Sequence, residues 1–194
     1  MNPSLRPALG SLAAMAALSL APSAHAQVTL SSISHVTVVN SDLRSFDIDG
    51  DGTDDFWVNT TFATPTLAPT DGANTVYSVF DNSVGETLQL FANGDTIFAN
   101  GGTSTELGFD LFTGSTGYVG VNFQRGGQSF AGWVLFDLTA GNGDVVIDSA
   151  GWQATYGADI AAGATPVPEP ATTAATAGVL AGLAVWLRRR RAAR

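Results

Sequence analysis

Residues 117–138 read GYVGVNFQRGGQSFAGWVLFDL, and this stretch decides the class of fold. Over residues 119–124, apolar residues occupy every second position, which is the period of a strand with one buried face. Residues 133–138 form an apolar run broken only by Asp137, and they belong to a second candidate strand. Between the two, the sequence RGGQ at 125–128 favours a tight turn. We therefore predict an antiparallel hairpin that joins strands at 117–124 and 130–139.

The rest of the body repeats this pattern of short apolar runs separated by Gly, Asn and Asp. Further candidate strands are 33–38, 87–91 and 145–147, and no segment between residues 27 and 165 offers three turns of helical periodicity. The spacing of the breaks suggests about eight to eleven strands. We expect an all-β ectodomain over residues 27–163, built as a β-sandwich or a jelly roll.

The composition excludes several classes of site. The 194 residues contain no Cys and no Lys, which rules out disulfides, thiolate metal ligands and lysine Schiff bases. All 17 acidic residues lie between Asp42 and Glu169, a stretch with only two arginines, so residues 27–170 carry a net charge of −15. Such a body repels nucleic-acid phosphates and attracts divalent cations or basic partners. Alternatively, the acidity only keeps an exported domain soluble.

The first 26 residues have the pattern of a secretory signal peptide. Arg6 supplies the positive charge, residues 8–20 are apolar, and Ala24 and Ala26 fit the small-x-small cleavage rule. The apolar run is too short for a comfortable membrane span. We therefore expect export across the inner membrane and a mature chain that begins at Gln27.

The C-terminal residues have the pattern of a membrane anchor. Residues 164–170 form a Pro-rich linker, and residues 171–187 carry no charge. As a helix they would span roughly 25 Å, slightly less than the ~30 Å of a hydrocarbon core. The tail 188–194 would then act as a cytoplasmic stop, which leaves the body outside the inner membrane. The stop consists of four consecutive arginines, Arg188, Arg189, Arg190 and Arg191.

A motif in the linker carries a family resemblance. Val167, Pro168, Glu169 and Pro170, followed by an apolar helix and an Arg-rich end, resemble the PEP-CTERM sorting signal of Gram-negative bacteria. The resemblance implies that exosortase, a membrane-embedded processing enzyme, recognises the signal and removes the helix. The membrane-anchored precursor would then yield a mature form at the cell surface or outside the cell. Proteins of this class are linked to exopolysaccharide and biofilm export, which implies an association with exopolysaccharide.

A second resemblance covers residues 117–163. Gly117, Tyr118, Gly120 and Phe123 match the Gly-aromatic-x-Gly-x-x-Phe strand of an ectodomain that often accompanies PEP-CTERM signals. On the next strand of that group stands Tyr-Gly-Trp, which the sequence Ala-Gly-Trp at 131–133 replaces here. The group has no settled activity, so this resemblance implies no catalytic residue.

The motif whose residues suit metal binding is the acidic loop 47–55, which reads DIDGDGTDD. Oxygen-bearing residues recur at loop positions 1, 3, 5, 7 and 9, the ligand spacing of a calcium loop, with Gly at position 6 where the chain must bend. Five Asp within nine residues repel one another strongly unless a cation is bound. The predicted ligands of one structural Ca²⁺ are Asp47, Asp49, Asp51, the carbonyl of Thr53, and Asp55.

The flanks of the loop indicate its type. Position 12 is Val58, so the bidentate Glu of an EF-hand is missing, and residues 44–46 and 56–58 read as strands. The motif therefore resembles the Asp-x-Asp-x-Asp-Gly-x-x-Asp loop of integrin-type and FG-GAP β repeats, in which two strands hold the ion. The alternative is a plain acidic hairpin turn, since Asp and Gly are also the residues that turns use.

Other candidate sites are weaker. His35 is the only His of the expected mature chain and no Gly-x-Ser-x-Gly motif accompanies it, which disfavours a hydrolase. Trp57, Trp133 and Trp152 would form either a sugar-stacking platform or part of the core. We expect a non-enzymatic exported surface or matrix protein stiffened by calcium. The alternative is a carbohydrate-binding module for exopolysaccharide.

Overall fold

The computed structural model describes residues 27–61, 64–81, 85–103, 106–108, 115–139 and 143–167. All of these except Val167 belong to one compact unit, Ala26–Pro166. The predicted signal peptide, the sorting motif from Pro168 onward, the apolar helix and the Arg-rich tail lie outside the described residues. Within the described ranges, no helix is long and apolar enough to cross a membrane.

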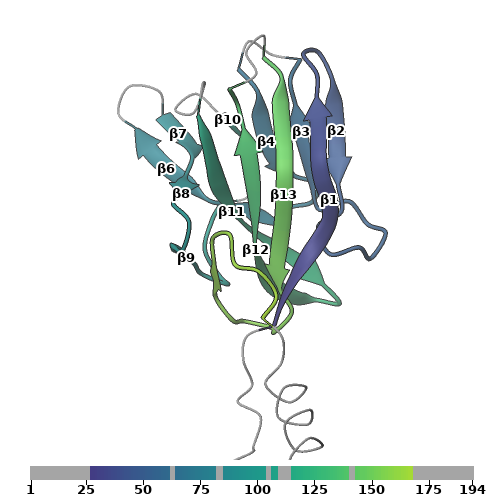
Figure 1. Ribbon diagram of the computed structural model, residues 1–194, viewed down its shortest axis with the longest axis vertical. Coiled ribbons are helices and arrows are strands. Elements are labelled where there is room, and N and C mark those ends of the chain that lie inside the picture. Colours follow the sequence, from purple (N-terminus) through teal and green to yellow (C-terminus); the bar gives the residue numbers. More distant parts are fainter. Residues whose placement is uncertain are drawn as a thin grey trace, which may run out of the picture. The chain divides into compact units, whose positions relative to one another are not determined.

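The described residues form fourteen strands in two six-stranded sheets and one two-stranded sheet (Figure 1). The first sheet has the order β1 (Val28–Val38), β13 (Val145–Gln153), β12 (Gln128–Asp137), β11 (Thr116–Arg125), β5 (Thr75–Val76), with β8 (Leu90–Phe91) also paired to β11. The second sheet has the order β2 (Leu43–Phe46), β3 (Phe56–Asn59), β4 (Thr66–Pro69), β10 (Leu107–Gly108), β7 (Gly85–Leu88), β6 (Ser78–Asp81). The small third sheet pairs β9 (Thr96–Ile97) with β14 (Ile160–Ala161).

The number of strands predicted from the sequence, about eight to eleven, is too low. Five of the observed strands (β5, β8, β9, β10 and β14) are only two residues long, which is too short for a readable period. The candidate strand 87–91 is in fact two strands in different sheets, β7 and β8. The chain passes from one sheet to the other at Gln89, whose amide donates to the Tyr77 carbonyl at 2.9 Å.

The predicted hairpin is confirmed as β11 and β12, which pair antiparallel from Thr116–Asp137 to Arg125–Gln128. Gly126 and Gly127 form its tip with φ of 59° and 77°. Two successive residues with positive φ are what a type I′ turn requires, and this turn matches the right-handed twist of the strands. The two glycines therefore allow the ladder to continue up to the turn.

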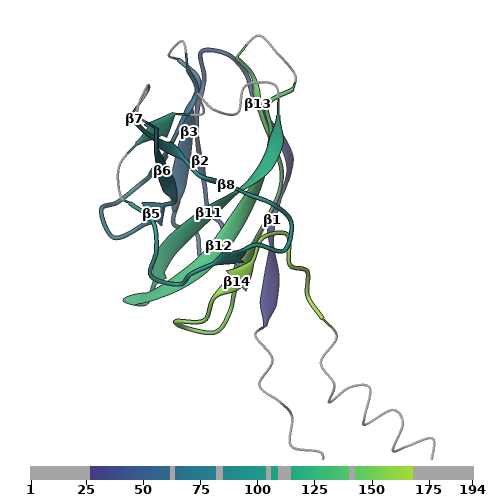
Figure 2. The ribbon, with the colours of Figure 1, turned by 90° about the vertical axis from the view of Figure 1, so that its left-hand side faces the viewer.

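The two large sheets face each other, and the layer between them is the main core (Figure 2). Phe56 and Leu67 enter this layer from the second sheet, and Val134 and Phe136 enter it from the first. The fold is therefore all-β with a sandwich-like arrangement of sheets, as expected, and no helix occurs among the described residues.

A second apolar cluster covers the other face of β12. Ala131 and Trp133 belong to this cluster, whereas Val134 and Phe136 belong to the main core, as the two-residue period of a strand requires. Because β12 is buried on both faces, its sequence reads as a nearly continuous apolar run.

The Trp133 ring packs against the strand beside it. Trp133 is paired with Gly151 of β13, and a Cβ added at Gly151 would lie 2.7 Å from the ring. Position 151 therefore requires a glycine because the Trp133 ring lies close to its backbone. The backbone conformation is not the reason, since the φ of Gly151 lies outside the left-handed region.

We predict that Gly151→Ala destabilises the fold by about 1–3 kcal/mol, because the buried indole ring must shift to admit the methyl group. Gly72→Ala is the matched control, since a Cβ there meets no atom within 4 Å, and it should cost less than about 0.5 kcal/mol. Urea unfolding measures both free energies. Equal unfolding midpoints for the two variants would show that the ring moves aside freely.

Candidate metal site

The acidic loop 47–55 connects β2 to β3, as its flanks predicted. These strands pair antiparallel from Leu43–Asn59 to Phe46–Phe56, and the Asp55 amide donates to the Phe46 carbonyl at 2.8 Å. The loop is therefore the tip of a β-hairpin, and two strands hold it.

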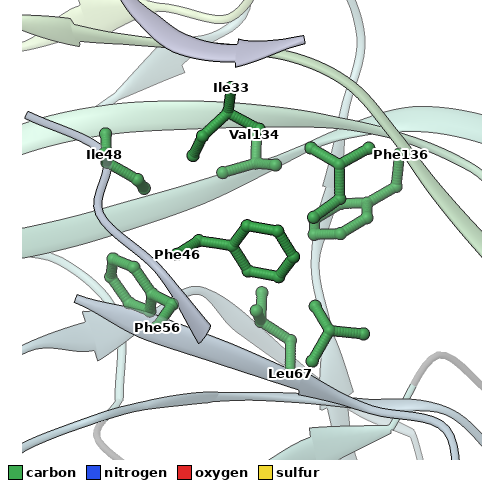
Figure 3. A pocket seen from close by; sticks show the side chains of 9 residues that line it. Ile33, Phe46, Ile48, Phe56, Leu67, Val134 and Phe136 are labelled. Carbon is green, nitrogen blue, oxygen red and sulfur yellow. The ribbon is translucent and has the colours of Figure 1, made fainter. Parts of the chain in front are cut away.

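Ile48 anchors this loop to the core. Its side chain is buried and faces the space between the sheets together with Phe46, Phe56 and Val134 (Figure 3). The void left there is about 10 Å³ and is lined by apolar side chains, so it has room for about one water but offers it no polar partner. Because Ile48 stands between Asp47 and Asp49, its burial holds the backbone that carries both carboxylates.

Three aspartates of the loop converge. Asp47, Asp49 and Asp55 each bring one carboxylate oxygen to within 4.8 Å of the other two, and we refer to them as the three-carboxylate group. All three belong to the predicted ligand set. Oxygen donors without nitrogen or sulfur suit a hard cation such as Ca²⁺.

Backbone amides hold Asp47 in position. Its Oδ1 accepts a hydrogen bond from the Gly50 amide and its Oδ2 accepts one from the Gly52 amide, both at 2.7 Å. The two glycines have φ of 77° and 92°, a backbone conformation that favours Gly. The glycines of the motif therefore allow the loop to wrap around the Asp47 carboxylate.

Asp49 and Asp55 are the buried members of the group. The Asp49 side chain is only 1% exposed although its backbone is partly open, and Asp55 is 5% exposed. Asp49 Oδ1 accepts a hydrogen bond from the Asp51 amide at 3.0 Å, whereas its Oδ2 has no hydrogen-bond partner. Asp55 Oδ2 accepts one from the Ile48 amide at 2.9 Å. A buried carboxylate oxygen without a hydrogen bond is costly, so additional positive charge at this place would stabilise the group.

Burial also changes the protonation of these residues. It raises the pKa of Asp55 to about 7, and it raises the pKa of Asp49 above its ordinary value. Loss of hydration is the largest cause for both, and repulsion by neighbouring aspartates adds to it. A cation held between the carboxylates would oppose both effects, because it stabilises their ionised forms.

Arg125 approaches the group from the end of β11. Its Nε lies 3.4 Å from Asp49 Oδ2, an ion pair without the geometry of a hydrogen bond. The guanidinium also lies over the Trp152 ring, 5.3 Å from the ring centroid. The sequence pattern did not associate Arg125 with the loop. The sequence marks Arg125 only as one of the two arginines in an acidic body.

Asp51 and Thr53 lie outside the three-carboxylate group. Asp51 is exposed, and its Oδ1 accepts a hydrogen bond from the Thr53 amide at 2.8 Å. The roles of the Asp51 carboxylate and the Thr53 carbonyl as ligands stay predictions.

The other candidate residues are dispersed. Trp133 and Trp152 are buried in two different apolar clusters, and Trp57 is half-buried on β3, so the three rings form no exposed row. His35 Nδ1 lies 3.1 Å from Asp148 Oδ1, with the imidazole side chain 80% exposed.

Comparison of the chain with family models, with curated proteins and with solved structures finds no match in any of the three. The resemblances to the PEP-CTERM signal, to its associated ectodomain and to the FG-GAP loop therefore stay predictions from the residues quoted above.

We predict that, in EDTA, the free energy of unfolding falls as the pH rises from about 4 to about 7. Asp55 has a pKa of about 7 in the folded chain and 3.8 as a free group, so the folded protein keeps a proton that the unfolded chain releases. This contribution is complete below pH 4 and is lost as the pH rises through 7, and it amounts to about 4 kcal/mol at most.

Asp55→Asn should flatten this pH dependence, because an amide does not ionise but still offers an oxygen to the Ile48 amide. Urea unfolding in EDTA at several pH values between 4 and 8 measures the slope for both proteins. An unchanged slope in the variant would assign the pH dependence to another group.

Proposed function

We propose that the protein is a non-enzymatic exported surface or matrix protein whose β-sandwich body is stiffened by one structural Ca²⁺. The observation that carries the calcium part is Asp49 Oδ2, a buried oxygen without a hydrogen bond inside a group of three carboxylates. A turn that served only solubility would keep its carboxylates in water, whereas this loop buries two of them.

In this proposal Asp47, Asp49 and Asp55 hold the ion, and Asp51 with the Thr53 carbonyl completes the oxygen donors. Ca²⁺ accepts irregular arrangements of six to eight oxygens, while Mg²⁺ demands a tight octahedron, so the loop suits calcium better.

The ion would stiffen more than the loop itself. The Asp55 carbonyl accepts hydrogen bonds from the Thr70 amide at 2.9 Å and from Asn74 Nδ2 at 3.1 Å. Asn74 Oδ1 in turn accepts one from the Gln124 amide at 2.9 Å. A cation that fixes Asp55 would therefore tie the β2–β3 hairpin to the segment after β4 and to β11.

The sorting part of the proposal rests on the sequence at the two ends of the chain. The signal peptide 1–26 would direct export, residues 171–187 would hold the precursor in the inner membrane, and exosortase would process it near Pro168-Glu169-Pro170. The mature form would join the cell surface or an exopolysaccharide matrix.

A carbohydrate-binding module for exopolysaccharide is the alternative function. The burial of Trp133 and Trp152 removes two of the three rings that a tryptophan platform would use, and Trp57 alone is half-buried. A glycan array would separate the two functions, because saturable binding that depends on Trp57 would favour the module.

We predict that calcium raises the melting temperature of the protein. An ion that binds only the folded state stabilises it by about 2.7 kcal/mol at a hundredfold excess over its Kd, which corresponds to several degrees. Magnesium should give a smaller shift. Differential scanning calorimetry in EDTA, in millimolar calcium and in millimolar magnesium measures this effect.

Two variants that each remove one negative charge from the loop test whether the calcium shift in melting temperature arises at the three-carboxylate group. Asp49→Asn should abolish most of the calcium shift, because it removes a buried member of the three-carboxylate group. Asp54→Asn removes a charge from the same loop but from an exposed residue outside the group, so it should keep the shift. Identical melting curves of the wild type in EDTA and in calcium would leave the loop as a plain acidic turn.

We also predict that Glu169→Ala leaves a larger, membrane-retained species in a host that contains exosortase, because the Pro-Glu-Pro motif is lost. Glu86→Ala, an exposed glutamate of the body, is the control and should be processed normally. Membrane fractionation and mass spectrometry distinguish the species. Detection of Arg194 on the mature surface form of the wild type would refute processing at this signal.

A further inference from the structure

Positive charge is scarce around the acidic loop. The stretch from Asp42 to Glu169 contains 17 acidic residues and two arginines. One of these, Arg44, pairs with Asp42, with 3.0 Å between Nε and Oδ2. The other, Arg125, is the arginine that faces Asp49, and it brings positive charge to that carboxylate.

The contact between Arg125 and Asp49 is close but incomplete. At 3.4 Å the Nε attracts Asp49 Oδ2 without hydrogen-bonding to it, although the carboxylate is almost fully buried. A strong arginine–carboxylate pair is shorter and is often bidentate. The same guanidinium lies over Trp152, so it is shared between a carboxylate and an aromatic ring. Such a partner can be displaced.

The fold places Arg125 beside the loop through a buried amide. Asn74 is 3% exposed and bridges the Asp55 carbonyl and the Gln124 amide. The backbone of β11 next to Arg125 is thereby fixed to the loop. The Arg125 side chain itself is 44% exposed, so it has a path into water.

We infer that Arg125 competes with the metal ion for Asp49 and thereby sets how much calcium the site requires. This inference rests on the proposed calcium site and names a residue that tunes it. Without calcium, the guanidinium offsets part of the charge of Asp49. A divalent cation that enters the three-carboxylate group repels the guanidinium and takes over Asp49 Oδ2, so the loss of this ion pair weakens calcium binding.

Calcium titration of the full-length protein by isothermal titration calorimetry tests the inference. Arg125→Gln should lower the Kd for calcium about tenfold, which is 1.4 kcal/mol at 25 °C. Arg44→Gln removes the same charge from the other arginine of the body and should change the Kd by less than about twofold. Arg125→Lys keeps the positive charge and should stay within about threefold of the wild type.

The outcomes separate this inference from the proposed function. If the wild type binds calcium and Arg125→Gln binds it with equal or lower affinity, the inference is wrong. The proposed calcium site is then still supported. Equal gains in Arg125→Gln and Arg44→Gln also overturn it, because net charge alone would then explain them. Absence of calcium binding in the wild type and in Arg125→Gln overturns the calcium site itself, and the inference with it.

A second measurement does not depend on the folding of Arg125→Gln. Because the guanidinium lies over Trp152, its displacement should change the tryptophan fluorescence of the wild type on addition of calcium. Trp152→Phe should remove that change. A wild-type protein that binds calcium with unaltered fluorescence would show that Arg125 stays in place, contrary to the inference.

Discussion

The apolar layer between the two sheets holds the acidic loop as well as the sandwich, because Ile48 belongs to that layer. Ile48 stands between two aspartates in the chain, yet its side chain packs with the core of both sheets. An acidic turn without such an anchor keeps its charges in water. Here the packing of one isoleucine draws the neighbouring backbone toward the core, and the carboxylates of Asp49 and Asp55 are buried beside it.

The burial of these carboxylates links three features of the loop. Water no longer reaches Asp49 Oδ2, and the amides of the loop satisfy only some of the carboxylate oxygens. A proton on Asp55, the guanidinium of Arg125 and a divalent cation all supply positive charge to the same place. Only the cation would serve all three carboxylates at once. The raised pKa of Asp55, the ion pair between Arg125 and Asp49 and the proposed calcium site therefore have the same cause, which is the buried negative charge of the carboxylates.

The side chains of Trp133 and Trp152 serve packing. The Trp133 ring covers Gly151, and the Trp152 ring meets Phe123 and Phe130 edge to face, at centroid distances of 5.7 Å. These two indoles lie in different clusters, one between the sheets and one on the other face of β12. Neither ring is free to stack on a sugar, which supports a structural role for the body over a tryptophan-based glycan site.

The sequence by itself determined the features that arise within a few residues: the β11–β12 hairpin with its glycine turn, the strands on either side of the acidic loop, and the spacing of Asp47, Asp49 and Asp55. Strand period and turn chemistry act locally, so they can be read along the chain. Only the tertiary structure decided the pairing of β1 with β13, the change of sheet at Gln89, the burial of Asp49 and the approach of Arg125. Many short strands satisfy the same alternation, and both burial and Coulomb attraction depend on which distant segments the sandwich brings together.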